Sequence, residues 1–354
     1  MVRILHTADL HRGAPSAHPV YNTRALPELV NLAVRKHCDY IVVVGDIFDK
    51  PKPDQTVKDF LVRQLLDTKR QIEFIFIPGN HDYTTKTLEY HSLNYLHYLR
   101  EASNYKVNIH IVEPGAYIAF DKLSVFAMES WGDVALAEQE HDGSKPLVIA
   151  WHGTVPGLQF SNIKHVPKET YKSIKQILEK TNAQYIALGD IHRTMKLHPR
   201  CWYPGPPVQK AYSDKDGVLL VAMNMVNTKV KKYKLPLPKK ITLEVVFEEG
   251  VDSEETIIEF VKDTIPANNL LKLKFELPLK LWGSLNQNYI KESLQDHCLE
   301  VKLENDPIPD IRTRASIEKV SKAKSLQQEV DIVLSEEDFG LDVKKLRKTC
   351  RKYL

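Results

Sequence analysis

Five short apolar segments in the first 200 residues are each followed at once by carboxylate, amide or imidazole side chains. The residues in this pattern, in chain order, are Asp9, His11, Asp46, Asn80, His81, His152, Asp190 and His192. Oxygen and imidazole ligands suit Mn²⁺, Mg²⁺, Zn²⁺ or Fe, and the thiolates of a structural zinc site are absent from this set. The pattern therefore predicts a metal centre.

The set holds more ligands than one ion needs, so we expect two ions that share a bridging carboxylate. Two ions about 3.5–4 Å apart can hold the attacking and the leaving oxygen of an in-line phosphoryl displacement. Such ions also lower the pKa of a bound water enough to supply hydroxide near neutral pH. The chemistry that fits best is hydrolysis of a phosphoester.

The elements that must position these residues are short strands separated by helices. The apolar segments cover residues 2–5, 40–44, 74–77, 147–150 and 185–188, and helical patterns cover 25–36, 56–69, 87–101 and 168–180. Continuous apolar runs of this length are typical of strands buried on both faces. An α/β sheet of this kind binds ligands at the carboxyl ends of its strands, where the polar residues lie.

Composition and length bound the remaining possibilities. The chain has 354 residues, 43% hydrophobic and 27% charged, with a net charge of +3. These values exclude collagen, low-complexity disorder and a disulfide miniprotein. The four cysteines lie far apart, no apolar run could span a bilayer, and the first residues lack a signal-peptide pattern. We therefore expect a cytoplasmic protein with no membrane segment.

Two proline-rich segments divide the chain into three parts. Residues 1–240 form the α/β domain and end in Pro-Leu-Pro-Lys-Lys. Residues 241–305 alternate strand and helix patterns in a smaller αβ module. Residues 306–354 begin with a second proline linker and continue as a charged, partly helical tail with a basic end at 344–352.

The ordered motifs Asp-X-His, Gly-Asp-X-X-Asp, Gly-Asn-His-Asp, His-Gly and Gly-X-X-His resemble those of the calcineurin-like metallophosphoesterases. Within that superfamily, residues 6–13, 45–49, 187–192 and 203–205 are similar to the SbcD-type nuclease subunits of DNA-end-processing complexes. The resemblance implies a layered β-sandwich flanked by helices, with 241–305 as a capping domain and 306–354 as a helical partner-binding tail. It also implies a Mn²⁺-dependent DNA exonuclease/endonuclease, with Mg²⁺ as a second candidate ion.

The same resemblance assigns roles to the motif residues. Asp9, His11, Asp46 and His192 would hold the first ion, and Asn80, His152 and Asp190 would complete the second, with Asp46 bridging. His81 would act on the scissile phosphate, and Asp49 and Asp82 would hydrogen-bond to the ligands. Asp190 departs from the histidine that is usual in the family. A harder, anionic ligand favours Mn²⁺ or Mg²⁺ over Zn²⁺.

Partners and alternatives also follow from the resemblance. It implies DNA as substrate, an SbcC-type SMC-like ATPase as partner, and a homodimer formed through helices near 87–101. Leu88, Ser92, Tyr95 and Leu99 form a stripe there, a pattern that more often marks a core-facing helix than an interface. Apolar residues among the charges of the tail suit docking on a partner. Two other functions stay open: a stand-alone small-molecule phosphoesterase, and a catalytically weak DNA or partner scaffold. Taken alone, Asp9 could be a helix cap and His152 a buried structural histidine.

Overall fold

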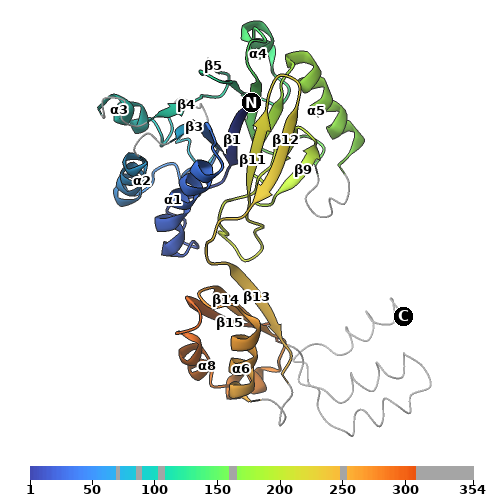
Figure 1. The fold of residues 1–354 in the computed structure, drawn as a ribbon. Coiled ribbons are helices and arrows are strands. Elements are labelled where there is room, and N and C mark those ends of the chain that lie inside the picture. The colour runs from blue at the N-terminus through green and yellow to red at the C-terminus, as the bar shows by residue number, and fades with distance from the viewer. Residues whose placement is uncertain (69–71, 85–89, 103–107, 159–165, 248–252, 308–354) are drawn as a thin grey trace, which may run out of the picture. The chain divides into compact units, whose positions relative to one another are not determined.

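The computed structural model describes residues 1–68, 72–84, 90–102, 108–158, 166–247 and 253–307 (Figure 1). It divides the chain into two compact units, Met1–Ile241 and Thr242–Leu354. The boundary lies next to the proline-containing linker at 236–240. Most of the predicted tail, from residue 308 on, lies outside the described residues, and so does its basic end.

The first unit contains a six-stranded sheet in the order β12-β11-β1-β2-β3-β4. Its strands are β1 (Val2–Thr7), β2 (Tyr40–Val44), β3 (Glu73–Ile77), β4 (Ile109–Ile111), β11 (Val218–Met223) and β12 (Thr228–Tyr233). The strands β1 to β4 are parallel to their neighbours, and β11 pairs antiparallel with both β1 and β12. The carboxyl ends of β1, β2 and β3 therefore meet at one edge.

A second six-stranded sheet has the order β5-β6-β7-β8-β10-β9. Its strands are β5 (Tyr117–Ala119), β6 (Ser124–Ala127), β7 (Leu147–His152), β8 (Tyr185–Gly189), β9 (Met195–His198) and β10 (Cys201–Tyr203). β7 and β8 are parallel, in a register that places His152 beside Gly189. The second sheet thus also brings two of the motif-bearing strand ends together.

The two sheets pack face to face and bury one core between them. Tyr40, Val42 and Val44 of β2 point into that core together with Tyr185 and Ala187 of β8, and all are at most 1% exposed. The intervening residues point the other way, where helices cover them, as Ile186 and Leu188 do in the cluster that includes Ile177 and Leu178. Burial on both faces explains why these strands read as continuous apolar runs.

Helices cover the outer faces of this sandwich: α1 (Pro19–Arg35), α2 (Gln55–Asp67) and α3 (Tyr95–Ala102) on the side of the first sheet, and α4 (Ala135–Glu140) and α5 (Lys168–Thr181) on the side of the second (Figure 1). α1 starts with a proline, whose missing N–H costs nothing in the first turn, and His18 accepts a hydrogen bond from the Val20 N–H. α5 ends at Asn182 in the left-handed conformation. The predicted α/β class, with sheets flanked by helices, is confirmed.

The second unit is built on a three-stranded sheet in the order β13-β14-β15. The strands are β13 (Lys240–Val245), β14 (Leu270–Phe275) and β15 (Glu300–Asn305), and the helices are α6 (Glu254–Thr264), α7 (Leu279–Ser284) and α8 (Gln287–Leu294). α6 begins with a reciprocal capping box between Ser253 and Thr256. The strands and helices of this unit alternate as predicted for residues 241–305.

One helix prediction in the first unit is wrong. The pattern at 87–101 predicted a single helix, but α3 begins only at Tyr95, and His91 forms an isolated bridge with Tyr83 instead. The buried Ser92 bonds to Asp82, so it belongs to the loop and not to a helical stripe. Of the predicted stripe, Tyr95 and Leu99 lie on α3, and Leu88 lies outside the described residues.

Candidate metal centre

The loops that follow β1, β2 and β8 adopt a strained backbone at the predicted ligands. Seven described non-glycine residues have a positive φ, and four of them are predicted ligands: Asp9 (54°), His11 (41°), Asp46 (50°) and Asp190 (99°). Such conformations are costly for residues with a Cβ and persist only where surrounding contacts enforce them, which is common at functional sites. The backbone N–H groups of Asp9 and His11 donate to the carbonyl oxygens of Gly45 and Asp46, at 3.1 and 2.9 Å, and so hold the first two loops together.

Two glycines let the two sheets approach at this edge. A Cβ on Gly45, whose φ is +81°, would lie 1.8 Å from Nδ1 of His152, and a Cβ on Gly189 would lie 1.9 Å from the carbonyl oxygen of Val44. No side chain fits at either position. The ligand-bearing loops of the first sheet therefore reach those of the second because these two residues are glycine.

Asp9, His11 and His192 form one group of side chains that could hold an ion, with one ligand atom from each within 4.8 Å of the others. The Nε2 atoms of His11 and His192 face one another at 3.1 Å. Burial lowers the pKa of His11 to about 4, so its imidazole is neutral near pH 7 and has a lone pair to offer. The group contains three of the four residues predicted for the first ion, and the fourth, Asp46, lies in the other two groups.

Asp214 orients the outer nitrogen of His192. Its Oδ1 lies 3.5 Å from Nδ1 of His192, and this contact raises the pKa of the imidazole. Sequence reasoning missed Asp214, because it belongs to no motif. Its only signal is its place in the loop that follows Tyr203-Pro204-Gly205.

Asp9, Asp46 and His152 form a second such group. His152 Nδ1 donates to the Val44 carbonyl oxygen at 2.9 Å, which leaves Nε2 directed at Asp46 Oδ1 (3.2 Å) and Asn80 Oδ1 (3.0 Å). An imidazole fixed through one nitrogen in this way presents the other to a metal. The predicted second-site residues Asn80 and His152 are thus brought together with Asp46.

Burial and close charges set the protonation of this second group. Burial disfavours the charged form of Asp46, but the hydrogen bond and charge of His152, together with the hydrogen bond from the His81 N–H, outweigh it and lower the pKa of Asp46 to about 2. For His152 too, the contact with Asp46 outweighs burial and raises the pKa to about 10. Burial raises the pKa of Asp9 to about 7. An ion that binds here must therefore displace protons, as metals commonly do.

His81 completes a third group with His11 and Asp46, its Nε2 lying 4.0 Å from Asp46 Oδ2. Its backbone N–H donates to Asp46 Oδ1 at 2.9 Å, and its Nδ1 contacts the carbonyl oxygen of Asp49 at 2.7 Å. The side chain is 39% exposed, whereas that of Asp46 is only 4% exposed. His81 therefore lies at the open side of the cluster.

Asp190 has a different environment from the other predicted ligands. Its carboxylate accepts a hydrogen bond from the Thr154 hydroxyl at 3.0 Å, and its backbone N–H donates to the Asp9 carboxylate at 3.0 Å. Its side chain is in none of the three groups. The structure thus ties Asp190 to the site through its backbone, and its carboxylate to Thr154, which the sequence did not single out.

Asp49 and Asp82 support the cluster in two ways. Asp49 Oδ1 lies 3.3 Å from His11 Nδ1 and 2.5 Å from Nζ of Lys210, a residue that no motif indicated. The fully buried Asp82 accepts hydrogen bonds from the backbone N–H groups of Ile47, Phe48 and Gly79. Asp82 therefore fixes the loops after β2 and β3 and not a ligand side chain.

The residues present fit a pair of divalent ions. Buried carboxylate oxygens, an amide oxygen and imidazole nitrogens converge on Asp46, and two Nε2 atoms face each other without an intervening acceptor. This hard oxygen and imidazole donor set suits Mn²⁺, Mg²⁺, Zn²⁺ or Fe.

The family model of the calcineurin-like phosphoesterases matches residues 2–194, more than half of the chain and all five motif-bearing strands. The chain belongs to the calcineurin-like phosphoesterase family. This membership supports hydrolysis of a phosphoester at a divalent metal centre. In the part of the chain that the structure describes, no helix is long and apolar enough to cross a membrane.

The calcineurin-like phosphoesterase chain is also similar in part to repair proteins. The DNA double-strand break repair protein Mre11 of Saccharolobus solfataricus is 33% identical over 87 residues, 23% of each chain. Mre11 of Archaeoglobus fulgidus is 27% identical over 101 residues, 27% of this chain and 23% of that protein. The aligned segment thus spans less than a quarter of these relatives.

Two solved structures, a phosphatase and a nuclease, align loosely with this chain. A protein serine/threonine phosphatase from Saccharomyces cerevisiae aligns with a TM-score of 0.32 and 11% identity, covering 71% of this chain and 82% of that one. The Pseudomonas putida nuclease MPE aligns with a TM-score of 0.25 and 14% identity, covering 42% of this chain and 60% of that one. At such TM-scores the alignments support no functional comparison.

Proposed function

We propose that this chain is a DNA exonuclease/endonuclease that hydrolyses phosphodiester bonds with two Mn²⁺ ions, which Mg²⁺ can replace. The observation that carries the proposal is the position of the Asp46 carboxylate between the two ligand groups, 3.6 Å from Nε2 of His11 and 3.2 Å from Nε2 of His152. Partial similarity to the Mre11 proteins supports DNA as the substrate.

Each protein group has a defined task in this proposal. Asp9, His11 and His192 hold one ion, Asn80 and His152 hold the other, and Asp46 contacts both groups. When bound, the ions supply Lewis-acid polarisation of the phosphate and a water of lowered pKa. Asp49 and Asp214 keep the outer nitrogens of His11 and His192 in place, which fixes the direction of the ligating nitrogens.

His81 is the residue we propose for the transition state. Its Nδ1 is held by the Asp49 carbonyl oxygen, its Nε2 lies 4.0 Å from Asp46 Oδ2, and its side chain is 39% exposed at the open side of the cluster. There it can donate a hydrogen bond to the phosphate and a proton to the leaving oxygen. One positioned acid–base group of this kind contributes about 10²–10⁴ in rate.

The proposed partner is an SbcC-type SMC-like ATPase, bound through the C-terminal tail, and the proposed assembly is a homodimer. Support for dimerisation comes from α3, where Tyr98 is 72% exposed on the surface. Cross-linking of the purified chain, with Tyr98→Glu as the disrupting variant, tests the dimer. Co-purification with the ATPase, with and without residues 306–354, tests the docking.

Digestion of linear duplex DNA tests the nuclease directly. We expect Mn²⁺-dependent shortening of the DNA that EDTA stops, with slower hydrolysis of p-nitrophenyl phosphate mono- and diesters. The Asp46→Asn protein is the inactive control. If the small esters are hydrolysed but DNA stays intact in the presence of the ATPase, the nuclease proposal is wrong and a stand-alone small-molecule phosphoesterase is supported. If DNA is bound but neither substrate is hydrolysed, a catalytically weak scaffold is supported.

A further inference from the structure

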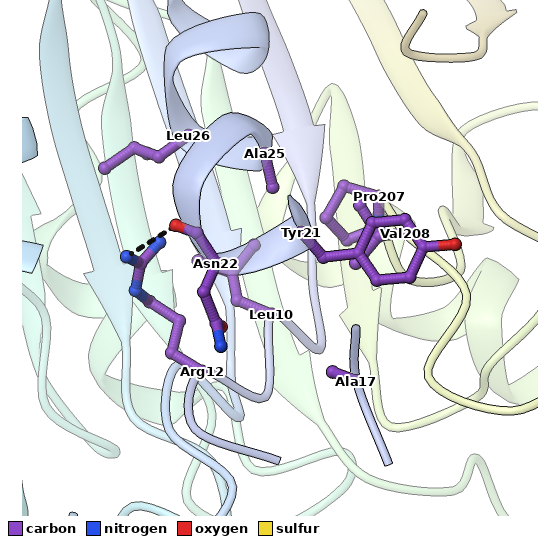
Figure 2. Close-up of a pocket in the computed structure, with 9 residues that line it drawn as sticks. All are labelled: Leu10, Arg12, Ala17, Tyr21, Asn22, Ala25, Leu26, Pro207 and Val208. Carbon is purple, nitrogen blue, oxygen red and sulfur yellow. Dashed lines mark hydrogen bonds between the residues drawn. The ribbon is translucent and has the colours of Figure 1, made fainter. Parts of the chain in front are cut away.

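Arg12, the residue after the ligand His11, is a buried cation among neutral partners. It is 4% exposed. Its Nη2 donates to the carbonyl oxygen of Asn22 at 3.1 Å, drawn in Figure 2, and to Oε1 of Gln64 at 2.7 Å. Its Nε is buried without a hydrogen-bond partner, and among the described residues Arg12 forms no ion pair with an acid.

A buried guanidinium without an acidic partner destabilises the fold when no anion is bound. Burial lowers the pKa of Arg12 to about 10, so the guanidinium still carries its charge near pH 7. A buried charge without a counter-ion destabilises the fold, and an anion that binds beside it removes that cost. The Tyr95 hydroxyl, on which the Arg12 charge also acts, is likewise buried without a hydrogen-bond partner.

Arg12 lines two hollows of very different size. The enclosed one, drawn in Figure 2, has a volume of about 10 Å³, barely enough for one water. The other is an open pocket of about 230 Å³ between α1 and α2. Since one water takes about 30 Å³ in the liquid, only this open pocket can admit a polyatomic ligand.

The walls of the open pocket come from the first two turns of α1 and of α2. Asn22 and Thr23 come from α1, Thr56 and Phe60 from α2, and no lining residue is acidic. Neither helix carries an acid in its first turn, and the carboxylate of Asp54, which precedes α2, is paired with Lys50 at 3.2 Å. Both helix N-termini therefore add positive potential to that of Arg12.

The position of the pocket relates it to the metal centre. Helices α1 and α2 follow β1 and β2, so their first turns lie at the same edge of the sheet as the ligand loops. The Arg12 N–H donates to the Ile47 carbonyl oxygen at 3.0 Å, directly beside the loop that carries Asp46. The Phe60 ring, 5.8 Å from the guanidinium, forms an apolar wall opposite the charge.

We propose that the pocket between the first turns of α1 and α2 binds a phosphate group of a nucleic-acid strand, with Arg12 as its anchoring cation. This phosphate is distinct from the one hydrolysed at the metal centre. The nucleic-acid source rests on the proposed function, whereas phosphate recognition does not. EDTA removes the divalent ions through which the metal centre would bind phosphate, so the test is made in EDTA.

Binding to EDTA-treated protein tests the pocket without catalysis. The probes are inorganic phosphate, followed by the rise in melting temperature, and a six-nucleotide fluorescent strand with or without a 5′-phosphate, followed by anisotropy. We expect phosphate to stabilise the wild type, and the phosphorylated strand to bind more tightly than its 5′-hydroxyl twin. If inorganic phosphate binds but neither strand does, the site takes free phosphate, and a nucleic-acid strand as the source is overturned.

Two variants assign the binding to this pocket. Arg12→Gln removes the cation, and affinity for phosphate should fall about 10-fold or more, the usual loss for a hydrogen bond to a charged group. Thr56→Glu adds a carboxylate at the exposed rim, where it favours the helix N-terminus but repels an anion, so it folds and should weaken binding similarly. Gln55→Glu makes the same charge change one residue outside the lining and should bind as the wild type does.

The outcomes separate the pocket from the proposed nuclease. Phosphate that fails to stabilise the wild type, or that binds equally to Thr56→Glu and Gln55→Glu, overturns the pocket. If phosphate binding depends on Arg12 but the protein cleaves no DNA, the phosphate pocket is supported and the nuclease proposal is wrong. If the protein cleaves DNA but binds no phosphate in EDTA, the nuclease is supported and the phosphate pocket is wrong.

Discussion

Gly189, at the end of β8, lets the carboxyl ends of the two sheets approach closely enough for the metal centre to form. In Gly189→Ala the new Cβ would lie 1.9 Å from the Val44 carbonyl oxygen and 2.7 Å from Nδ1 of His152. Cβ atoms in proteins essentially never come within 3.0 Å of such neighbours, so β8 and β2 must separate by at least about 1 Å. Gly189 is not left-handed, and its substitution therefore acts through steric overlap alone.

The loss of stability in Gly189→Ala depends on which atom the new Cβ overlaps. The Val44 oxygen is backbone in a buried strand and cannot rotate away, so the overlap costs about 1–3 kcal/mol of unfolding free energy. For a unit of this size that lowers the melting temperature by roughly 2–12 °C. The hydrogen bond from His152 Nδ1 to the same oxygen is also displaced. Because Asp46 follows β2 and His192 follows β8, the same shift misplaces the ligands, and a 1 Å error costs about 10² in rate.

The assay measures Mn²⁺-dependent hydrolysis of bis-p-nitrophenyl phosphate together with thermal unfolding by circular dichroism. The matched control is Gly283→Ala, where the new Cβ has no atom within 4 Å. That control should keep full activity and an unchanged or slightly higher melting temperature. If Gly189→Ala unfolds and hydrolyses like the control, the close approach of the two sheets is not what builds the site.

Four further predictions follow from the same geometry. Asp46→Asn removes the carboxylate that lies between His11 and His152 and that we propose as the bridging ligand, so metal analysis after dialysis against Mn²⁺ should find both ions depleted and hydrolysis lost; full occupancy would contradict a bridging role. His81→Ser should lose about 10²–10⁴ in rate yet keep both ions and bind DNA, whereas loss of an ion would make His81 a ligand. Asp190→Ala should lose the second ion and activity if its carboxylate ligates, and Asp190→His should shift the metal preference towards Zn²⁺ or Fe; wild-type activity in the alanine variant would show that only the Asp190 backbone matters. His6 is buried against Tyr185 and the Leu188 carbonyl oxygen, and burial lowers its pKa to about 3. Below pH 6.5 the unfolded chain therefore binds a proton that the folded chain excludes, so the free energy of unfolding should fall by about 1.4 kcal/mol per pH unit down towards pH 3. Urea unfolding of His6→Gln across this pH range should give a smaller slope.

Local sequence determined the elements and the kind of chemistry. Strands buried on both faces must be apolar at every position, so β2 and β8 stood out as continuous runs with bounds accurate to one residue. Helix α6 could be placed correctly because its periodicity extends from a capping residue to its end. The types of the metal ligands could be predicted because polar residues directly after buried strands lie at the edge of the sheet, where they contact water, a ligand or an ion.

The errors at the level of elements have local causes. Helix α3 was placed too early, because an apolar pattern near 87–101 has helical spacing, while Ser92 and His91 are held in a loop by contacts with Asp82 and Glu113. Such contacts come from elsewhere in the chain and override a local periodicity. The short strands β4, β5 and β6 were missed since three or four residues carry too little pattern to distinguish a strand from a loop.

Only the tertiary structure decided which residues meet. Lys210 and Asp214 reach His11 and His192 across about 200 and 22 residues of chain, and no motif marks them. The Thr154 partner of Asp190 and the neutral surroundings of Arg12 are equally invisible in sequence. A linear pattern reports what each residue can do and what its near neighbours favour. Which charges face each other, and which are left without a partner, depends on how closely two sheets pack, and here that distance is set by the absence of a Cβ at Gly45 and Gly189.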